Sequence, residues 1–160
     1  MGKIVTLEEL KQERERARTE GLRFVFTNGC FDLVHRGHVE LLRAARNLGD
    51  VLAVAINSDA SVTRLKGPRR PIVSQDDRAA VVAALDSVDY VTIFDEDTPE
   101  RVITVLLPDV LVKGADYELD EIVGREQVEA SGGRVVRIPL LEGYSTEKLL
   151  QEIARRYSET

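Results

Sequence analysis

Short apolar runs alternate with helical patterns along most of this chain of 160 residues. The runs are rich in Val and Ile and mostly lack strict polar alternation, as strands of a parallel sheet do when helices cover both faces. They occupy residues 22–27, 51–57, 90–94, 110–113 and 134–138. The patterns after them predict helices at residues 37–48, 75–86, 98–107, 121–131 and 145–157. This alternation predicts a doubly wound α/β fold, with a five-stranded parallel sheet and helices on both faces.

The N-terminal segment precedes this Rossmann-like arrangement and predicts a helix over residues 3–20. Thr6 suits the N-cap position, and Glu9 three residues on completes a capping box. Thr98 and Pro99 likewise predict an N-cap followed by proline at the first helical position. We therefore expect an N-terminal helix within 1–21 and one compact domain over 22–160.

The composition narrows the class of protein. A net charge of -6, no Trp and 5% aromatic residues argue against a nucleic-acid partner. No apolar stretch approaches the length of a membrane span, and the N-terminus lacks the apolar region of a signal peptide. A single cysteine excludes an intrachain disulfide framework. We expect a cytoplasmic enzyme or binding module with no membrane or nucleic-acid partner.

Residues 27–38, TNGCFDLVHRGH, form what we call the histidine turn, between the first predicted strand of the domain and the next helix. Ligands of open α/β sheets bind outside the carboxyl ends of the strands, which is where this turn lies. His35 and His38, the only two histidines, flank a predicted helix N-terminus, where N–H groups and the helix dipole favour anions. Gly29 allows a tight turn, and Gly37 lets a phosphate approach the backbone. The two imidazoles add donors that can carry charge near pH 7.

Two alternatives stay open for the histidine turn. The histidine pair can be purely structural. It can also belong to a metal site, since four side chains of the turn offer ligands: Cys30, Asp32, His35 and His38. The spacing of these four straddles a loop and a helix start, which disfavours convergence on one ion. The turn matches neither the P-loop nor the GxGxxG fingerprint, so phosphate binding here would use another arrangement.

Two further segments carry candidate anion-binding groups. Positive charge is concentrated in the sequence RLKGPRRP, at Arg64, Lys66, Arg69 and Arg70. Its glycine and prolines favour a loop that closes over anionic substrates, with a solvated basic loop as the alternative. Residues 113–117 follow the fourth strand, on the same sheet edge as the histidine turn. There Lys113 could contact a phosphate, and Asp116 could hold a ribose or base, or simply form the turn.

The H-x-G-H sequence at residues 35–38, preceded by GCFD, resembles the signature of the cytidylyltransferase-like nucleotidyltransferase superfamily. This resemblance implies that both histidines contact the triphosphate and stabilise the transition state. A second superfamily signature resembles GYST at 143–146, which implies another triphosphate contact; helix capping alone is the alternative there. The nucleotide-binding candidates are Asn28, Gly29, Cys30, Phe31, Gly37, Lys113, Gly114, Asp116, Ser145 and Thr146.

Beyond these signatures, the sequence is similar to the adenylyltransferases that act on D-glycero-β-D-manno-heptose 1-phosphate and make ADP-heptose for bacterial lipopolysaccharide. The similar stretches are residues 57–72, 77–85, 98–103 and 108–117. Many relatives are fused to a sugar kinase, so the resemblance implies a stand-alone form working with a separate heptose kinase. It also suggests a homodimer or higher oligomer, with the helix at 3–20 as a candidate contact. Glu147 and Ala115 depart from the family, which often has Thr and Gly there.

The implied reaction is in-line attack of the sugar 1-phosphate on the α-phosphorus of ATP. Its catalytic candidates are His35, His38 and Lys66, and its sugar-phosphate candidates are Asp32, Lys66 and Arg69. Asp32 could instead only brace its loop. We expect Mg²⁺ as cofactor, held by the triphosphate and not by protein side chains. Two rivals stay open: a cytidylyltransferase for glycerol 3-phosphate or a related phosphoalcohol, and a non-catalytic nucleotide-binding module.

Overall fold

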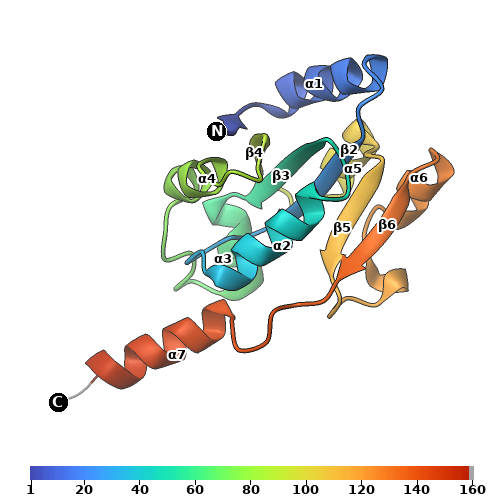
Figure 1. Ribbon diagram of the computed structural model, residues 1–160. Coiled ribbons are helices and arrows are strands. Elements are labelled where there is room, and N and C mark those ends of the chain that lie inside the picture. Colours follow the sequence, from blue (N-terminus) through green and yellow to red (C-terminus); the bar gives the residue numbers. More distant parts are fainter. Residues whose placement is uncertain (159–160) are drawn as a thin grey trace.

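The computed structural model describes residues 1–158 and contains a six-stranded, fully parallel sheet (Figure 1). Its strands lie in the order β1-β4-β3-β2-β5-β6. They are β1 (Lys3–Ile4), β2 (Phe24–Gly29), β3 (Val51–Asn57), β4 (Tyr90–Phe94), β5 (Val110–Gly114) and β6 (Arg134–Ile138). From β2 the chain first builds toward β3 and β4, then returns to add β5 and β6 on the other side. The doubly wound α/β prediction is confirmed, with one strand more than expected.

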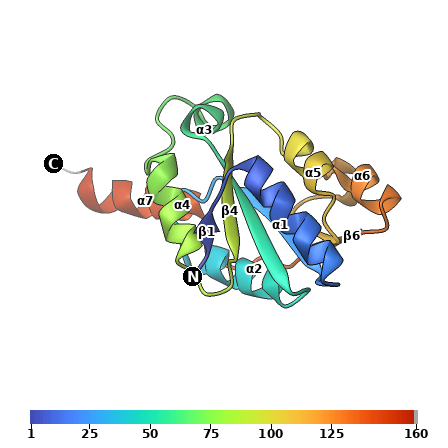
Figure 2. The same cartoon turned by 90° about the horizontal axis from the view of Figure 1, so that it is seen from above.

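Helices cover both faces of the sheet (Figure 2). One apolar core lies under α2 (Arg36–Arg46) and α4 (Gln75–Ala83), and includes buried Leu42, Val82 and Val54. The other core lies under α1 (Leu7–Thr19), α5 (Glu100–Leu106) and α6 (Arg125–Ala130). The remaining helices are α3 (Asp59–Lys66), the 3₁₀ turn η1 (Leu119–Glu121) and α7 (Thr146–Tyr157). The strands β2 to β5 are largely buried between these helices, which explains why their sequences lack polar alternation.

The predicted N-terminal helix is wrong in its first residues. Lys3 and Ile4 form the edge strand β1 and pair with Tyr90 and Val91 of β4. The helix α1 begins at Leu7, after the predicted capping box, in which the Thr6 hydroxyl accepts from Glu9 N and the Glu9 carboxylate accepts from Thr6 N. A two-residue strand is too short to leave a periodic pattern, and its pairing partner lies 87 residues further along the chain.

Three other predicted elements differ from the structure. The basic sequence RLKGPRRP is not all loop: α3, capped by Ser58, extends to Lys66 and carries Arg64 in its last turn. Pro99 occupies the N-cap position of α5, one residue later than expected. The helix predicted over 121–131 is divided into η1 and α6, with Gly124 between them at a positive φ of 87°. That backbone conformation suits glycine and interrupts a helix.

The helix α1 is anchored to its own domain through a buried arginine. The Arg14 guanidinium donates to the Leu106 and Leu107 carbonyls at 3.0 and 2.9 Å and pairs with Asp109 at 3.2 Å. Leu10 and Ala17 are buried on the same side of the helix. A partner contact through α1 would therefore use only its outer face.

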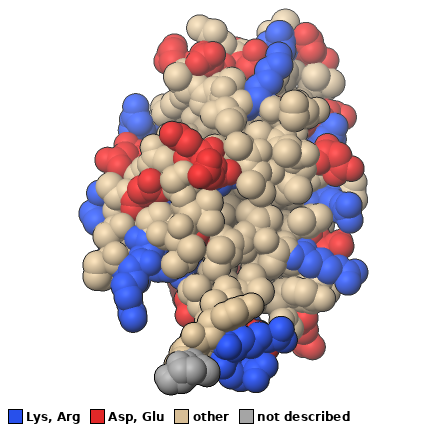
Figure 3. Space-filling view, turned by 90° about the vertical axis from the view of Figure 1, so that its left-hand side faces the viewer, with Lys and Arg blue, Asp and Glu red and all other residues tan. Residues whose placement is uncertain are grey.

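By contrast, α7 extends away from the sheet in both views, and none of its residues is buried (Figures 1 and 2). On the side toward which α7 points, acidic and basic side chains are scattered around a wide uncharged area (Figure 3). Within residues 1–158, no helix combines the length and apolar character needed to cross a membrane.

Candidate active site

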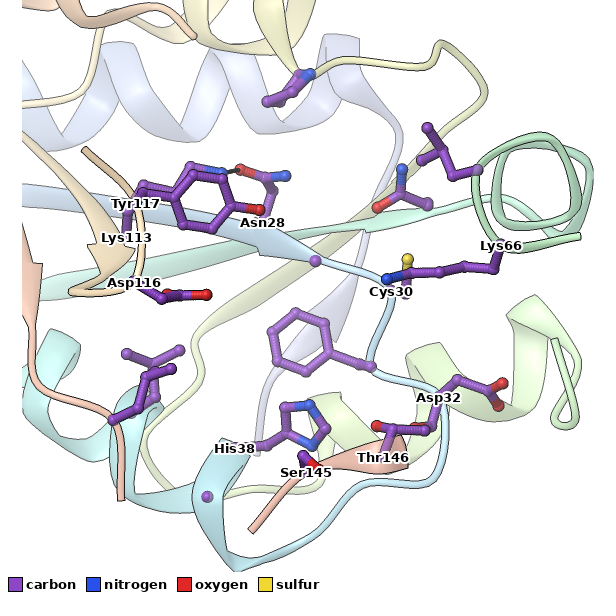
Figure 4. Close-up of a pocket in the computed structure, with 18 of the residues that line it drawn as sticks. Asn28, Cys30, Asp32, His38, Lys66, Lys113, Asp116, Tyr117, Ser145 and Thr146 are labelled. Carbon is purple, nitrogen blue, oxygen red and sulfur yellow. Dashed lines mark hydrogen bonds between the residues drawn. The ribbon is translucent and has the colours of Figure 1, made fainter. Parts of the chain in front are cut away.

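A cavity of about 700 Å³ opens at the carboxyl ends of β2 and β5, where the strand order reverses. This is the place where open α/β sheets bind ligands. The cavity brings together segments that are far apart in the chain (Figure 4). Its lining includes most predicted site residues: Asn28, Gly29, Cys30, Phe31, Asp32, His35, Gly37, His38, Lys66, Lys113, Asp116, Ser145 and Thr146. Gly114 lines an adjoining cavity of about 190 Å³, and Arg69 lines neither.

The two histidines form a stacked pair at the N-terminus of α2, with ring centroids 3.9 Å apart. His35 is the N-cap residue, and its Nδ1 accepts from Gly37 N at 3.1 Å. The Nδ1 of His38 accepts in turn from His35 N at 3.2 Å. Because both Nδ1 atoms are acceptors, this network assigns the ring proton of each neutral imidazole to Nε2. Each Nε2–H remains available to donate to a ligand.

The surroundings of both imidazoles favour their neutral form. Burial and the proximity of His35 lower the pKa of His38 to about 4, and burial also lowers the pKa of His35. A neutral Nε2–H can still donate to a phosphate oxygen. The pair therefore offers directed donors, and the positive potential comes from the helix N-terminus beside them.

Gly37 is required by the packing of this pair. A Cβ atom at Gly37 would lie 2.8 Å from Cε1 of His35 and 3.2 Å from Cβ of Tyr144. The first distance is shorter than real Cβ contacts and the second is tight, so a larger residue would displace the His35 ring. The glycine thus protects the geometry of the histidine turn as well as the approach to its backbone.

Asp32, one of the four candidate metal ligands in the histidine turn, is engaged in hydrogen bonds within the protein. The Asp32 carboxylate accepts from Arg70 Nε at 2.8 Å, from Ile72 N at 2.8 Å and from Val73 N at 3.0 Å. Burial alone would raise the pKa of Asp32, but these hydrogen bonds and the Arg70 charge lower it. The side chain has no exposed surface. These contacts favour the interpretation that Asp32 braces the loop over direct contact with a sugar phosphate.

Of the four basic residues in RLKGPRRP, two line the cavity. Lys66 extends from the end of α3 toward Cys30 (Figure 4). Arg70 lies beside Asp32. Arg64 instead pairs with Asp97 at 2.7 Å, and Arg69 is exposed outside the cavity. Arg70, and not Arg69, therefore reaches the cavity. Adjacent residues of a loop look equivalent in sequence, and only the loop path distinguishes them.

The Lys113 side chain is buried, unlike a phosphate-binding lysine on the protein surface. Its ammonium donates to Oδ1 of Asn28 and sits 5.4 Å from the ring centroid of Tyr117 (Figure 4). Burial lowers the pKa of Lys113 to about 8, although Asp116 nearby opposes that shift. A Cβ atom at Gly114 would lie 2.6 Å from Oδ1 of Asp116, so the glycine leaves room for that carboxylate. This end of the cavity offers polar groups beside an aromatic face.

The start of α7 forms the opposite wall. The Ser145 hydroxyl accepts from Lys148 N at 3.1 Å, so it caps the helix as the alternative interpretation required. Thr146 Oγ1 donates to the Asp32 carbonyl at 3.1 Å, which ties α7 to the histidine turn. The capping role leaves the second lone pair and the hydroxyl proton of Ser145 free to meet a ligand.

Sequence reasoning missed Arg78, a fully buried arginine on α4. Its guanidinium donates to the carbonyls of Cys30, Asn57 and Val73 at 2.6, 2.8 and 2.9 Å and pairs with Asp59 at 2.8 Å. It therefore joins the ends of β2 and β3 to the loop before α4. An arginine next to two aspartates at a helix start looks solvent-facing, so no local signal identified it.

The fold and the site together define an α/β nucleotidyltransferase. A family model described as cytidylyltransferase-like matches residues 26–152, so the chain belongs to the cytidylyltransferase-like family. This family implies a nucleotide substrate and typically a divalent metal ion.

The chain is also similar to individual proteins. It is 52% identical over 155 residues to the bifunctional protein HldE of Citrifermentans bemidjiense, covering 97% of this chain and 32% of that protein. Against HldE of Geobacter sulfurreducens it is 54% identical over 142 residues, covering 89% and 29%. The chain thus spans about a third of the length of these curated relatives. The crystal structure of the lipopolysaccharide core biosynthesis protein from Thermoplasma volcanium GSS1 is 29% identical, with a TM-score of 0.65, over 76% of this chain and 100% of that one.

Proposed function

We propose that this protein transfers AMP from ATP to D-glycero-β-D-manno-heptose 1-phosphate, forming ADP-heptose and pyrophosphate. One observation supports AMP transfer most directly: two neutral imidazole donors at a helix N-terminus share a cavity with the Lys66 cation. The heptose acceptor is supported by the similar stretches at 57–72, 77–85, 98–103 and 108–117, and by the HldE relatives.

The acceptor needs no general base in this reaction. A phosphate monoester has its second pKa near 6, so its oxygen is already anionic at neutral pH. Attack on the α-phosphorus forms the new P–O bond while the bond to the pyrophosphate oxygen breaks. The requirement is therefore to align two anions and to stabilise the charge that moves onto the pyrophosphate.

The residues of the cavity fit these two tasks. The Nε2–H groups of His35 and His38 would donate to oxygens of the α- and β-phosphates. The N-terminus of α2 adds positive potential at the same place. Lys66 would lie between the two substrates and reduce their mutual repulsion. The nucleoside would extend along the polar wall formed by Asn28, Lys113 and Asp116.

Mg²⁺ is part of the proposal. It usually keeps several waters and binds phosphate oxygens with only one or two carboxylates. Among residues 1–158, no three His, Cys, Asp or Glu side chains are grouped to hold a metal ion. In this proposal the triphosphate supplies most of the ligands of the ion. When bound, the ion neutralises charge on the phosphates.

The proposal also includes a separate kinase that supplies the heptose 1-phosphate, a homodimeric or larger assembly, and a cytoplasmic location. The reaction requires a kinase activity, because the acceptor must reach this site already phosphorylated.

A substrate panel tests the activity directly. The protein is incubated with each of four NTPs, Mg²⁺ and a set of sugar and polyol phosphates, and pyrophosphate release is measured. We expect release with ATP and heptose 1-phosphate. Release only with CTP and glycerol 3-phosphate would support the phosphoalcohol cytidylyltransferase instead. No release with any pair would support a non-catalytic nucleotide-binding module.

A further inference from the structure

Arg70 has a guanidinium that is fixed at one end and loosely held at the other. Its Nε donates to the Asp32 carboxylate at 2.8 Å, and its Nη1 lies 3.4 Å from the Glu147 carboxylate. The two carboxylates differ sharply in environment. The Asp32 side chain has no exposed surface, whereas 71% of the Glu147 side chain is exposed.

The fixed end gives Arg70 a defined direction. Asp32 accepts from Arg70, Ile72 and Val73, so its carboxylate is itself held by three donors. The Thr63 hydroxyl also donates to the Arg70 carbonyl at 2.7 Å, which holds the backbone. Only 10% of the Arg70 side chain is exposed, and it lines the main cavity. The guanidinium is thus oriented before any ligand arrives, which favours tight binding.

The loosely held end of the Arg70 guanidinium carries N–H groups that can bind a phosphate. A guanidinium presents parallel N–H groups that match two oxygens of a phosphate, and charge-assisted pairs of this kind are strong. A contact of 3.4 Å to one oxygen of an exposed carboxylate is long and weak by comparison. A phosphate reaching Arg70 would therefore gain more than the Glu147 contact loses.

We propose that Arg70 binds the phosphate of the acceptor, and that Glu147 occupies the same guanidinium until that phosphate displaces it. The identity of the acceptor rests on the proposed function; the anion site itself rests on the geometry of Arg70, Asp32 and Glu147. Glu147 follows Thr146, whose hydroxyl bonds to the Asp32 carbonyl. The competing carboxylate is therefore held close to Arg70 by the start of α7.

Kinetics with ATP and Mg²⁺ saturating and heptose 1-phosphate varied test this assignment. Arg70→Gln should raise the KM for the sugar phosphate by about 10- to 150-fold, since it removes a hydrogen-bonding charge. The KM for ATP should stay within twofold. Arg69→Gln is the matched control, because it removes a neighbouring charge outside the cavity, and it should change neither KM by more than twofold. Equal effects of the two variants would overturn the assignment.

Glu147→Gln tests whether the Glu147 carboxylate competes with phosphate for Arg70. This variant also allows the proposal to be refuted if Arg70→Gln folds poorly. The residue is exposed, so the fold should be retained, as circular dichroism would verify. We expect the KM for the sugar phosphate to fall roughly twofold to fivefold, the range of an exposed ion pair. An unchanged or higher KM would contradict the competition.

A binding experiment separates this inference from the proposed function. Inorganic phosphate is titrated calorimetrically into wild-type protein and the Arg70→Gln and Arg69→Gln variants, each saturated with a non-hydrolysable ATP analogue and Mg²⁺. Weaker phosphate binding in the Arg70 variant alone supports the anion site even if no sugar phosphate is turned over. Equal binding by all three proteins refutes it, whatever the substrate panel gives.

Discussion

At the scale of single residues, the site depends on which atoms of the two imidazoles are already engaged. Both Nδ1 atoms accept backbone N–H groups of the turn, which leaves Nε2–H as the only group each ring can offer. The sequence alone identified His35 and His38, but their protonation could not be predicted. It depends on burial and on the proximity of His35, which lower the pKa of His38 to about 4.

Replacing either histidine should therefore reduce turnover without unfolding the protein. Loss of one preorganised donor typically costs about 100- to 1,000-fold in rate. We expect a decrease of this order in kcat for His35→Ala and for His38→Ala, measured by pyrophosphate release. Circular dichroism and thermal unfolding provide the control for the fold. Near-wild-type kcat in either variant would remove that histidine from the catalytic groups.

The protonation of His38 can be measured by NMR, because the chain has only two histidines. The Hε1 signal of His38 should titrate with a midpoint near 4, well below the ordinary value of 6.5. Between these values the unfolded chain binds the proton and the folded protein does not, so stability is complete above pH 6.5 and falls as the pH drops toward 4. A midpoint near 6.5 would contradict the neutral pair.

At the scale of elements, the hydrophobic pattern predicted the strands and helices with a regular alternation of residues. It missed the features that depend on contacts with residues distant in the sequence. The strands β2 to β5 have buried apolar residues and β6 has half-buried ones, so the positions of these strands could be predicted. The edge strand β1 has two exposed residues and exists through pairing with β4. Arg78 resembles any helical surface arginine until three segments of the chain converge on it. In the site, the path of the loop likewise distinguishes Arg70 from Arg69.

Arg78 should be among the most important residues for stability. Its removal leaves the carbonyls of Cys30, Asn57 and Val73 without their donor, and unpaired buried groups cost about 1–3 kcal/mol each. We expect Arg78→Met to lower the free energy of unfolding by at least about 3 kcal/mol in urea titration. Arg101→Met, an exposed helical arginine, should cost less than about 0.5 kcal/mol. Equal costs would show that the Arg78 network does not stabilise the fold.

At the scale of the whole molecule, stability and function are distributed unevenly. The sheet and its two helical layers hold the core, whereas α7 supplies Ser145 and Thr146 to the site and buries none of its own residues. The cavity is therefore assembled from a rigid part, at the ends of β2 and β5, and a wall attached mainly through the first turn of α7.

This uneven distribution predicts a contrast between two apolar substitutions. Ile153→Ala on α7 should change the free energy of unfolding by less than about 0.5 kcal/mol, because 49% of Ile153 is already exposed. Leu10→Ala on α1 should cost about 2–5 kcal/mol, because Leu10 is fully buried. Urea titration of both variants measures the difference. A cost for Ile153→Ala similar to that for Leu10→Ala would mean that α7 is packed against other protein surface.

The central claim is that the α-phosphate of ATP is transferred to a sugar phosphate. It is tested by incubating the protein with heptose 1-phosphate, Mg²⁺ and ATP labelled with ³²P at either the α- or the γ-position. We expect the α-label to appear in ADP-heptose and the γ-label in pyrophosphate. Transfer of the γ-label to the sugar, or no transfer of the α-label to it, would contradict the proposed reaction.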